Sequence, residues 1–195
     1  MKSHVRVLVI GGGVVGVSTL YHLTKKGWTD VALIERTELT AGSTWHAAGL
    51  LPLFNMSYTV GQLHKYSVDL YKRLPAETGQ DVSFHVTGNL RLATCRERMD
   101  EYQKYCGTAN TIGVPFEVIS PAQVKRLWPL VELGGTAETP AIIGALYHPD
   151  DGHIAPADLT MALRKGARAL GAEIHEQTEV TGVKQIGRAS CRERV

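Results

Sequence analysis

A glycine-spaced turn between an apolar run and a helix constrains this chain most. Val5–Ile10 is short, apolar and rich in β-branched residues, which is typical of a buried parallel strand. The motif GxGxxG follows at residues 11–16, and residues 14–26 have the apolar spacing of a helix. Val31–Ile34 has the pattern of a second strand. This order predicts a βαβ unit, and we therefore expect an α/β, doubly wound fold.

Each part of the turn suits a dinucleotide. Gly11 permits the tight bend, Gly13 lets backbone approach a pyrophosphate, and Gly16 lets helix and strand pack closely. The helix begins at Val14. The free backbone N–H groups of Val14 and Val15 and the positive end of the helix dipole favour binding of phosphate there. The turn therefore predicts a phosphate-binding cradle.

An acidic residue completes the motif. Glu35 ends the second strand, 19 residues after Gly16, where its carboxylate can accept hydrogen bonds from ribose hydroxyls. A carboxylate there disfavours a 2′-phosphate, which argues against NADP. Arg36 follows it and belongs to the same candidate site. The motif by itself does not choose between NAD and FAD.

The segment after the second strand indicates a bulky planar ligand. Residues 35–50 are rich in small residues, which let backbone come close to such a ligand, and Ser43 and Thr44 add hydroxyl and amide donors. In doubly wound sheets, ligands bind at this position, beyond the carboxyl ends of the strands. The candidate cofactor-binding residues of this segment are Gly42, Ser43, Thr44, His46, Ala47, Ala48, Gly49 and Leu50.

The run Gly42-Ser-Thr-Trp-His-Ala-Ala-Gly49 resembles a motif of the D-amino-acid-oxidase-type flavoproteins, and more narrowly of dimethylglycine and sarcosine dehydrogenases. The resemblance extends over residues 5–184 and implies FAD, bound covalently through its 8α-methyl group to His46. It also implies a backbone contact from Val180, on a later strand, to the adenine side. From the residues alone, a buried, hydrogen-bonded His46 beside noncovalent FAD is the alternative. Further matching segments are Phe84-His85, Gly88–Ala93 and His148–Pro156.

The resemblance implies an activity as well. It is the oxidation of a small secondary or tertiary N-methyl amine, such as dimethylglycine or sarcosine, by hydride transfer to the flavin. Tetrahydrofolate would bind in a further domain and capture the one-carbon unit. The electron acceptor is not assigned, and no residue is assigned as catalytic. The alternatives are another amine substrate on the same fold and a non-catalytic regulatory paralogue.

Composition excludes several other classes. The net charge of +2 comes from the last ten residues, so nothing suggests nucleic acid as a partner. No apolar run approaches the roughly 20 residues of a membrane span. Three cysteines without CxxC spacing, and the pair Asp150 and Asp151 without ligand spacing, predict neither a disulfide framework nor a metal site. We expect a cytoplasmic location in a bacterium, or the mitochondrial matrix in a eukaryote whose transit peptide is missing here.

The chain divides near residue 185. We expect residues 1–185 to be the N-terminal part of an FAD-dependent oxidoreductase domain, truncated soon after an interleaved substrate domain begins. Residues 186–195 resemble the translation of a common sequencing-adapter oligonucleotide and are expected to be an adapter scar, with a genuine basic tail as the alternative. The natural protein would then continue past Lys184, and this 195-residue polypeptide would be inactive, since the substrate-binding residues lie by resemblance further on.

Local patterns predict the remaining elements. Ser120 is expected to cap a short helix that begins at Pro121. The other expected elements are a helix at 60–78, a hairpin at 82–94, a helix at 96–112, strands at 116–119 and 141–147, a helix at 157–170 and paired strands in 172–185.

Overall fold

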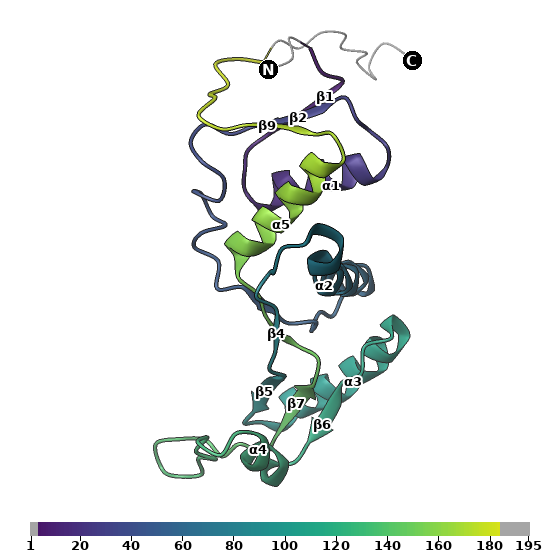
Figure 1. Cartoon of the computed structure of the whole chain (residues 1–195). Helices are drawn as coiled ribbons and strands as arrows, with labels where there is room; N and C mark the ends of the chain where they lie inside the picture. The colour runs from purple at the N-terminus through teal and green to yellow at the C-terminus, as the bar shows by residue number, and fades with distance from the viewer. Residues whose placement is uncertain (1–3, 184–195) are drawn as a thin grey trace, which may run out of the picture. The chain divides into compact units, whose positions relative to one another are not determined.

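The computed structural model describes residues 4–183, which form an α/β structure of two compact units (Figure 1). The first unit comprises the residues up to Ala47 and those from Leu163 onward, and the second comprises Ala48–Ala162. Helix α5 (Pro156–Ala169) contains the second boundary. No helix in residues 4–183 is both long enough and apolar enough to cross a membrane.

Three parallel strands form the sheet of the first unit. Their order is β1 (Val7–Ile10), β2 (Val31–Ile34) and β9 (Glu173–His175), and α1 (Val14–Lys25) connects β1 to β2. β2 pairs on both edges, Val7 with Val31 on one side and Ala32 with Glu173 on the other, and all four of its residues are buried. The predicted βαβ unit is therefore confirmed.

The predicted burial of β1 is wrong on one face. β1 is an edge strand of this sheet, and its side chains alternate between half-buried and exposed. Leu8 and Ile10 are 47% and 58% exposed. An apolar, β-branched run predicts the strand, but only the surroundings of the strand decide whether both faces are covered.

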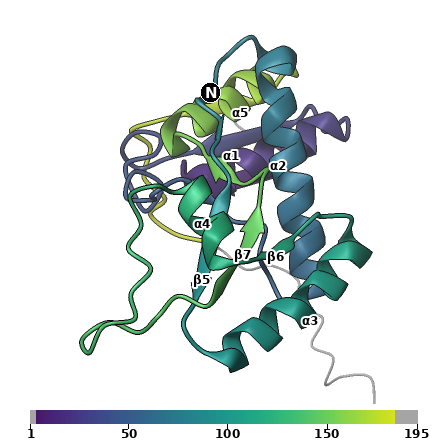
Figure 2. The same ribbon diagram turned by 90° about the horizontal axis from the view of Figure 1, so that it is seen from below.

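The second unit holds two small antiparallel sheets. One has the order β3 (Leu50–Leu51), β8 (Gly152–His153) and β4 (His85–Val86), and the other has the order β5 (Asn89–Ala93), β7 (Gly144–His148) and β6 (Glu117–Ile119). The helices are α2 (Tyr58–Thr78), α3 (Arg96–Ile112) and α4 (Pro121–Leu127) (Figure 2).

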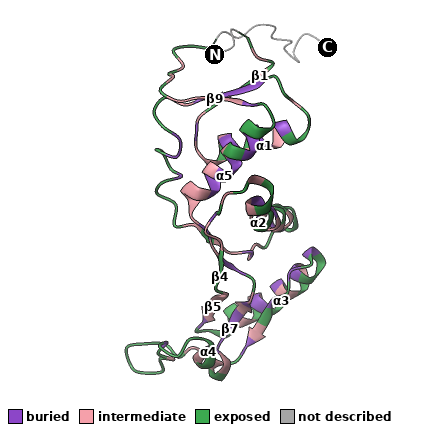
Figure 3. Ribbon diagram, viewed as in Figure 1, coloured by how far each residue is buried: buried purple, intermediate pink, exposed green. Residues whose placement is uncertain are grey.

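The two faces of β7 serve two different cores. Most of β7 is buried (Figure 3). Leu146 joins an aromatic core with Tyr102 and Tyr105 of α3, whereas Ala145 joins a core with Val124 of α4. This follows from the period of a strand, in which successive side chains point to opposite faces. The sheet β5-β7-β6 is therefore covered by α3 on one face and by α4 on the other.

Local sequence signals set the helix ends. Ser120 accepts a hydrogen bond from the Gln123 backbone N–H, and the Gln123 side chain accepts from the Ser120 N–H, which completes a capping box with Pro121 at the first helical position. Helix α3 ends at Gly113, whose φ of +76° is left-handed. Both predicted helices are confirmed, α3 with the predicted bounds.

The predicted hairpin at 82–94 is wrong. β4 pairs with β8, and β5 pairs with β7, so the two halves of the expected hairpin belong to different sheets. The bend between them is fixed from far along the chain, because the Thr87 and Gly88 backbone N–H groups donate to the Asp151 carbonyl at 3.1 and 2.8 Å. The prediction of paired strands in 172–185 is wrong as well, since β9 is the one strand in 172–183 and it pairs with β2; residues 184–195 lie outside the described residues.

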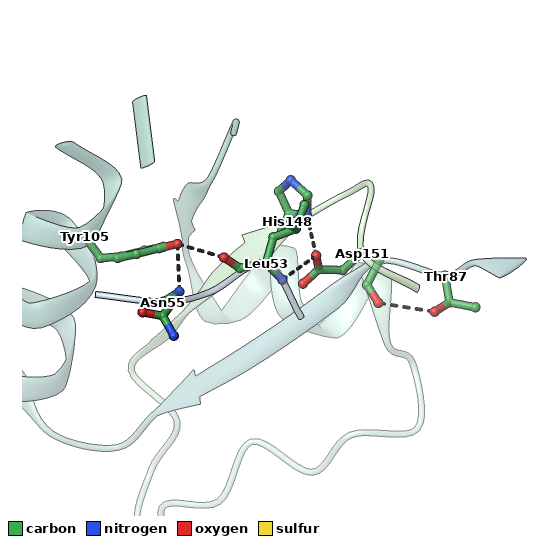
Figure 4. A network of polar contacts seen from close by, with 7 residues as sticks. Leu53, Asn55, Thr87, Tyr105, His148 and Asp151 are labelled. Carbon is green, nitrogen blue, oxygen red and sulfur yellow. Dashed lines mark hydrogen bonds and ion pairs between the residues drawn. The ribbon is translucent and has the colours of Figure 1, made fainter. Parts of the chain in front are cut away.

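Asp151 is a buried polar link in the second unit (Figure 4). Its Oδ1 accepts from the Leu53 backbone N–H at 3.0 Å and lies 2.8 Å from Nδ1 of His148. The side chains of Asp151 and His148 are both buried, at 3% and 1% exposure respectively. Together with the contacts to Thr87 and Gly88, this one residue holds three segments in place.

Candidate dinucleotide site

Two of the motif glycines are required by backbone geometry. Gly11 has a φ of +108°, which favours glycine, and its N–H donates to the Ile34 carbonyl at 2.9 Å. A Cβ on Gly16 would collide with the Gly11 carbonyl oxygen. These contacts bring the start of α1 against the turn, as the motif predicts.

Gly12 is a site residue that the motif does not include. A Cβ there would lie 2.5 Å from Cδ2 of Leu39 and 3.0 Å from Cβ of Glu35. Its backbone N–H donates to Oε2 of Glu35 at 2.7 Å, and its carbonyl accepts from the Thr40 N–H at 3.1 Å. The only sequence signal was the third glycine of an uninterrupted run, at a position where the motif accepts any residue.

The Glu35 carboxylate is fixed by backbone donors. Oε1 accepts from the Thr37 N–H at 2.8 Å and from the Thr37 hydroxyl at 3.1 Å, and Oε2 accepts from Gly12. These hydrogen bonds, that of the Thr37 backbone first, lower the pKa of the Glu35 carboxyl. Since a carboxylate offers about four acceptor positions, one position on Oε2 remains open for a further donor.

A turn over residues 40–47 closes onto the glycine loop. Thr40 adopts a φ of +71°, and the buried Thr44 hydroxyl accepts from the Val14 N–H at 2.9 Å. The sequence had suggested a free N–H at Val14. This prediction is wrong, because the Val14 N–H donates to Thr44. In residues 4–183, the N–H groups of Gly13, Val15 and Gly16 have no acceptor, so they are the donors left for an anion.

His46 is exposed within this turn. Its Nδ1 lies 3.1 Å from the Gly42 carbonyl oxygen. A carbonyl only accepts, so Nδ1 carries the proton, and the lone pair of the neutral ring is on Nε2. The ring is hydrogen-bonded as the alternative expects, but it is exposed and not buried; noncovalent FAD beside His46 stays an alternative.

Two cavities meet at this site. The first, of about 630 Å³, lies within the size range of cofactor sites. It is lined by Gly11, Gly12, Gly13, Val14, Val15, Glu35, Arg36, Thr37, Ala41, Gly42, Ser43, Thr44 and Ala47. The second, of about 320 Å³, is lined by Ile10, Gly11, Ile34, Glu35, Arg36, Thr178, Glu179 and Val180. Gly11, Glu35 and Arg36 line both, so the cavities are neighbours.

Most of the sequence candidates therefore gather here. Val180 lines the second cavity, although it follows β9 instead of lying on a strand. His46 lines neither cavity and stands beside Ala47, which does. The sequence analysis missed four lining residues, Thr37, Ala41, Thr178 and Glu179. Thr178 joins the site because its N–H donates to the Glu35 carbonyl at 2.8 Å, and no local sequence pattern predicts this contact.

The last three candidates belong to the second unit. Ala48 is exposed. Gly49 has a φ of +71°, and a Cβ there would collide with the Ile154 carbonyl oxygen. Leu50 begins β3 and is 69% exposed. No group of three or more metal-ligating side chains is found among residues 4–183.

The chain is similar in sequence to known proteins. The chain is 44% identical to mitochondrial dimethylglycine dehydrogenase of Rattus norvegicus over 183 residues, which are 94% of this chain and 21% of that protein. It is 38% identical to mitochondrial sarcosine dehydrogenase of Homo sapiens over 185 residues, 94% of this chain and 20% of that protein. The chain thus spans about a fifth of the length of these relatives.

A solved structure shares the fold. L-proline dehydrogenase from P. horikoshii superposes with a TM-score of 0.84 at 31% identity, over 93% of this chain and 46% of that one. The sequence also matches the FAD dependent oxidoreductase family over residues 6–194. The fold, the glycine cradle and these matches agree, and the chain belongs to the FAD-dependent oxidoreductase family.

Proposed function

We propose that this chain supplies the FAD-binding site of an enzyme that oxidises a small secondary or tertiary N-methyl amine, of the dimethylglycine or sarcosine type. The observation that carries the proposal is the closure of the 40–47 turn onto the glycine loop. Two hydrogen bonds, from Thr40 N–H to the Gly12 carbonyl and from Val14 N–H to the Thr44 hydroxyl, hold the segment that contains His46 against the dinucleotide cradle.

The residues of the cradle suit FAD. The free N–H groups of Gly13, Val15 and Gly16 would face the pyrophosphate, at the positive end of α1. The open acceptor position on Glu35 would bind a ribose hydroxyl, and the cavity that Val180 lines would take the adenine. Bound there, FAD would supply the acceptor for the hydride, which carries the two electrons removed from the amine.

We also propose that His46 bonds to the flavin. The Gly42 carbonyl holds the Nδ1 proton and so leaves the Nε2 lone pair available for a bond to the 8α carbon. Forming that bond replaces one C–H of the methyl group and releases two electrons and two protons to an external acceptor such as dioxygen. Nε2 substitution withdraws electron density, which would favour hydride acceptance.

Tetrahydrofolate would accept the one-carbon unit at a site outside these residues. The protein would be located in the mitochondrial matrix if its source is a eukaryote, and the mitochondrial dimethylglycine dehydrogenase of the rat supports this location.

A panel of amines tests the substrate class. The complete natural protein, purified with its flavin, would be mixed without oxygen with dimethylglycine, sarcosine, L-proline or glycine. We expect the yellow absorbance to bleach with dimethylglycine or sarcosine and to persist with glycine. Bleaching by L-proline alone would favour the alternative of another amine, to which the 31% identity with L-proline dehydrogenase points. Persistence with all four would contradict amine oxidation.

A further inference from the structure

Two histidines that are far apart in the sequence face each other across the sheet β3-β8-β4. His85 of β4 and His153 of β8 are directly opposite in the antiparallel register. Directly opposite residues point to the same face of a sheet. Their ring centroids are 5.1 Å apart, with an angle of 34° between the ring planes.

The backbone fixes this pair from both sides. The Thr87 and Gly88 N–H groups, just after β4, donate to the carbonyl of Asp151, just before β8. The Ile154 N–H, just after β8, donates to the Gly49 carbonyl at 2.9 Å, and a side chain on Gly152 would collide with the His85 carbonyl oxygen. The spacing between the two imidazoles is therefore built into the strands.

The imidazoles are available to a ligand. His85 is exposed and His153 is half-buried. Within residues 4–183, the ring nitrogens of His85 and His153 have no hydrogen-bond partner. The buried His148 differs, because its Nδ1 is hydrogen-bonded to Asp151. Imidazole nitrogen is a preferred ligand of zinc, copper and nickel ions.

The spacing suits one metal ion. With metal–nitrogen bonds of about 2.0 Å and roughly 1.1 Å from a ring nitrogen to its ring centre, two imidazoles at the tetrahedral angle have centroids about 5.1 Å apart. The pair already has this separation, so rotation of the rings would be enough to direct one nitrogen of each toward a shared ion.

We propose that His85 and His153 form a two-histidine clamp for a divalent transition-metal ion. Among the described residues no third histidine, cysteine or carboxylate completes the set, so water fills the other coordination positions. The clamp cross-links β4 to β8 and stabilises the second unit. It is independent of the proposed amine oxidation, because it uses none of the residues assigned to FAD.

The test is calorimetric titration of tag-free protein with copper, zinc or magnesium chloride. We expect one equivalent of copper or zinc to bind, copper more tightly than zinc, and magnesium not to bind, because it prefers oxygen ligands. His85→Asn and His153→Asn should each raise the Kd at least about tenfold.

His175→Asn is the matched control, a strand histidine whose Nε2 lies 2.9 Å from Glu173. It should leave the metal affinity unchanged. Circular dichroism without metal checks that each variant is folded, and the exposed His85 decides the outcome if His153→Asn does not fold. Equal affinity in wild type and His85→Asn, or loss of binding in His175→Asn alone, would overturn the clamp.

Discussion

The Thr44 hydroxyl accepts a hydrogen bond from the backbone N–H of Val14 at 2.9 Å, across 30 residues of chain. Val14 begins α1, and Gly13 before it has no side chain to act as a cap. A residue of the 40–47 turn thus caps the helix of the dinucleotide cradle, which couples the position of His46 to the glycine loop.

Removal of this cap should affect both stability and cofactor binding. Thr44→Val keeps the shape and loses the acceptor, and N-terminal caps contribute about 1 kcal/mol. We expect a loss of that size in the free energy of unfolding by urea, together with weaker FAD binding, measured by fluorescence quenching in a His46→Ala background. Thr44→Ser retains a hydroxyl and should behave like wild type; equal losses in both variants would show that the hydrogen bond is not the cause.

Gly12 offers a contrast with a glycine outside the site. Gly12→Ala places a methyl group 2.5 Å from Leu39 Cδ2, so we expect the glycine loop to shift and FAD affinity to fall at least about tenfold. Gly107→Ala, in α3 and outside the site, meets nothing within 4 Å and should bind FAD as wild type does. Isothermal titration with FAD in a His46→Ala background, where no covalent bond can form, distinguishes them, and unchanged affinity in Gly12→Ala would count against the described packing.

The pH dependence of stability should contain a contribution from Glu35. Its pKa is lowered in the folded state, so its stabilisation is present above its ordinary pKa of 4.5 and is lost as the pH falls through the lower folded value. The stability difference between wild type and Glu35→Gln should therefore be largest near neutral pH and shrink below about pH 4.5. Denaturation curves between neutral and acid pH measure it; a constant difference would contradict the assigned hydrogen bonds.

Asp151 and Asp150 differ by burial. Asp151→Ala leaves the Leu53 N–H and the His148 imidazole without their shared acceptor inside the second unit, and we expect a loss of about 3 kcal/mol in unfolding free energy. The neighbouring Asp150 is exposed, and Asp150→Ala should change stability by less than about 0.5 kcal/mol. Thermal and urea unfolding compare the two, and equal effects would refute the role of the Asp151 network.

The sequence predicted the elements whose signals are local. The βαβ unit follows from periodicity and glycine spacing, and α4 follows from Ser120, Pro121 and Gln123, which act within one helical turn. The hairpin failed because Asp151, far along the chain, fixes the bend after β4. Gly88, with a φ of +72°, does lie at a bend within the expected hairpin, but the strands on either side of it pair with other partners.

The candidate site divides in the same way. Gly11, Gly16 and Glu35 could be assigned because a known motif relates their spacing to a fold. Gly12 and Thr178 could not, because their roles arise from contacts with Leu39 and Glu35 that only the folded chain brings about. The exposed face of β1 could not be predicted for the same reason, because segments far along the chain decide which faces of a strand are covered.

Attachment of the flavin to His46 is tested most directly by acid precipitation of the complete natural protein. We predict that the yellow colour stays in the washed wild-type pellet and is lost from His46→Ala, while His4→Ala, at an exposed position outside the site, keeps it. Colour that washes out of the wild-type pellet, or that remains in the His46→Ala pellet, would contradict the assignment.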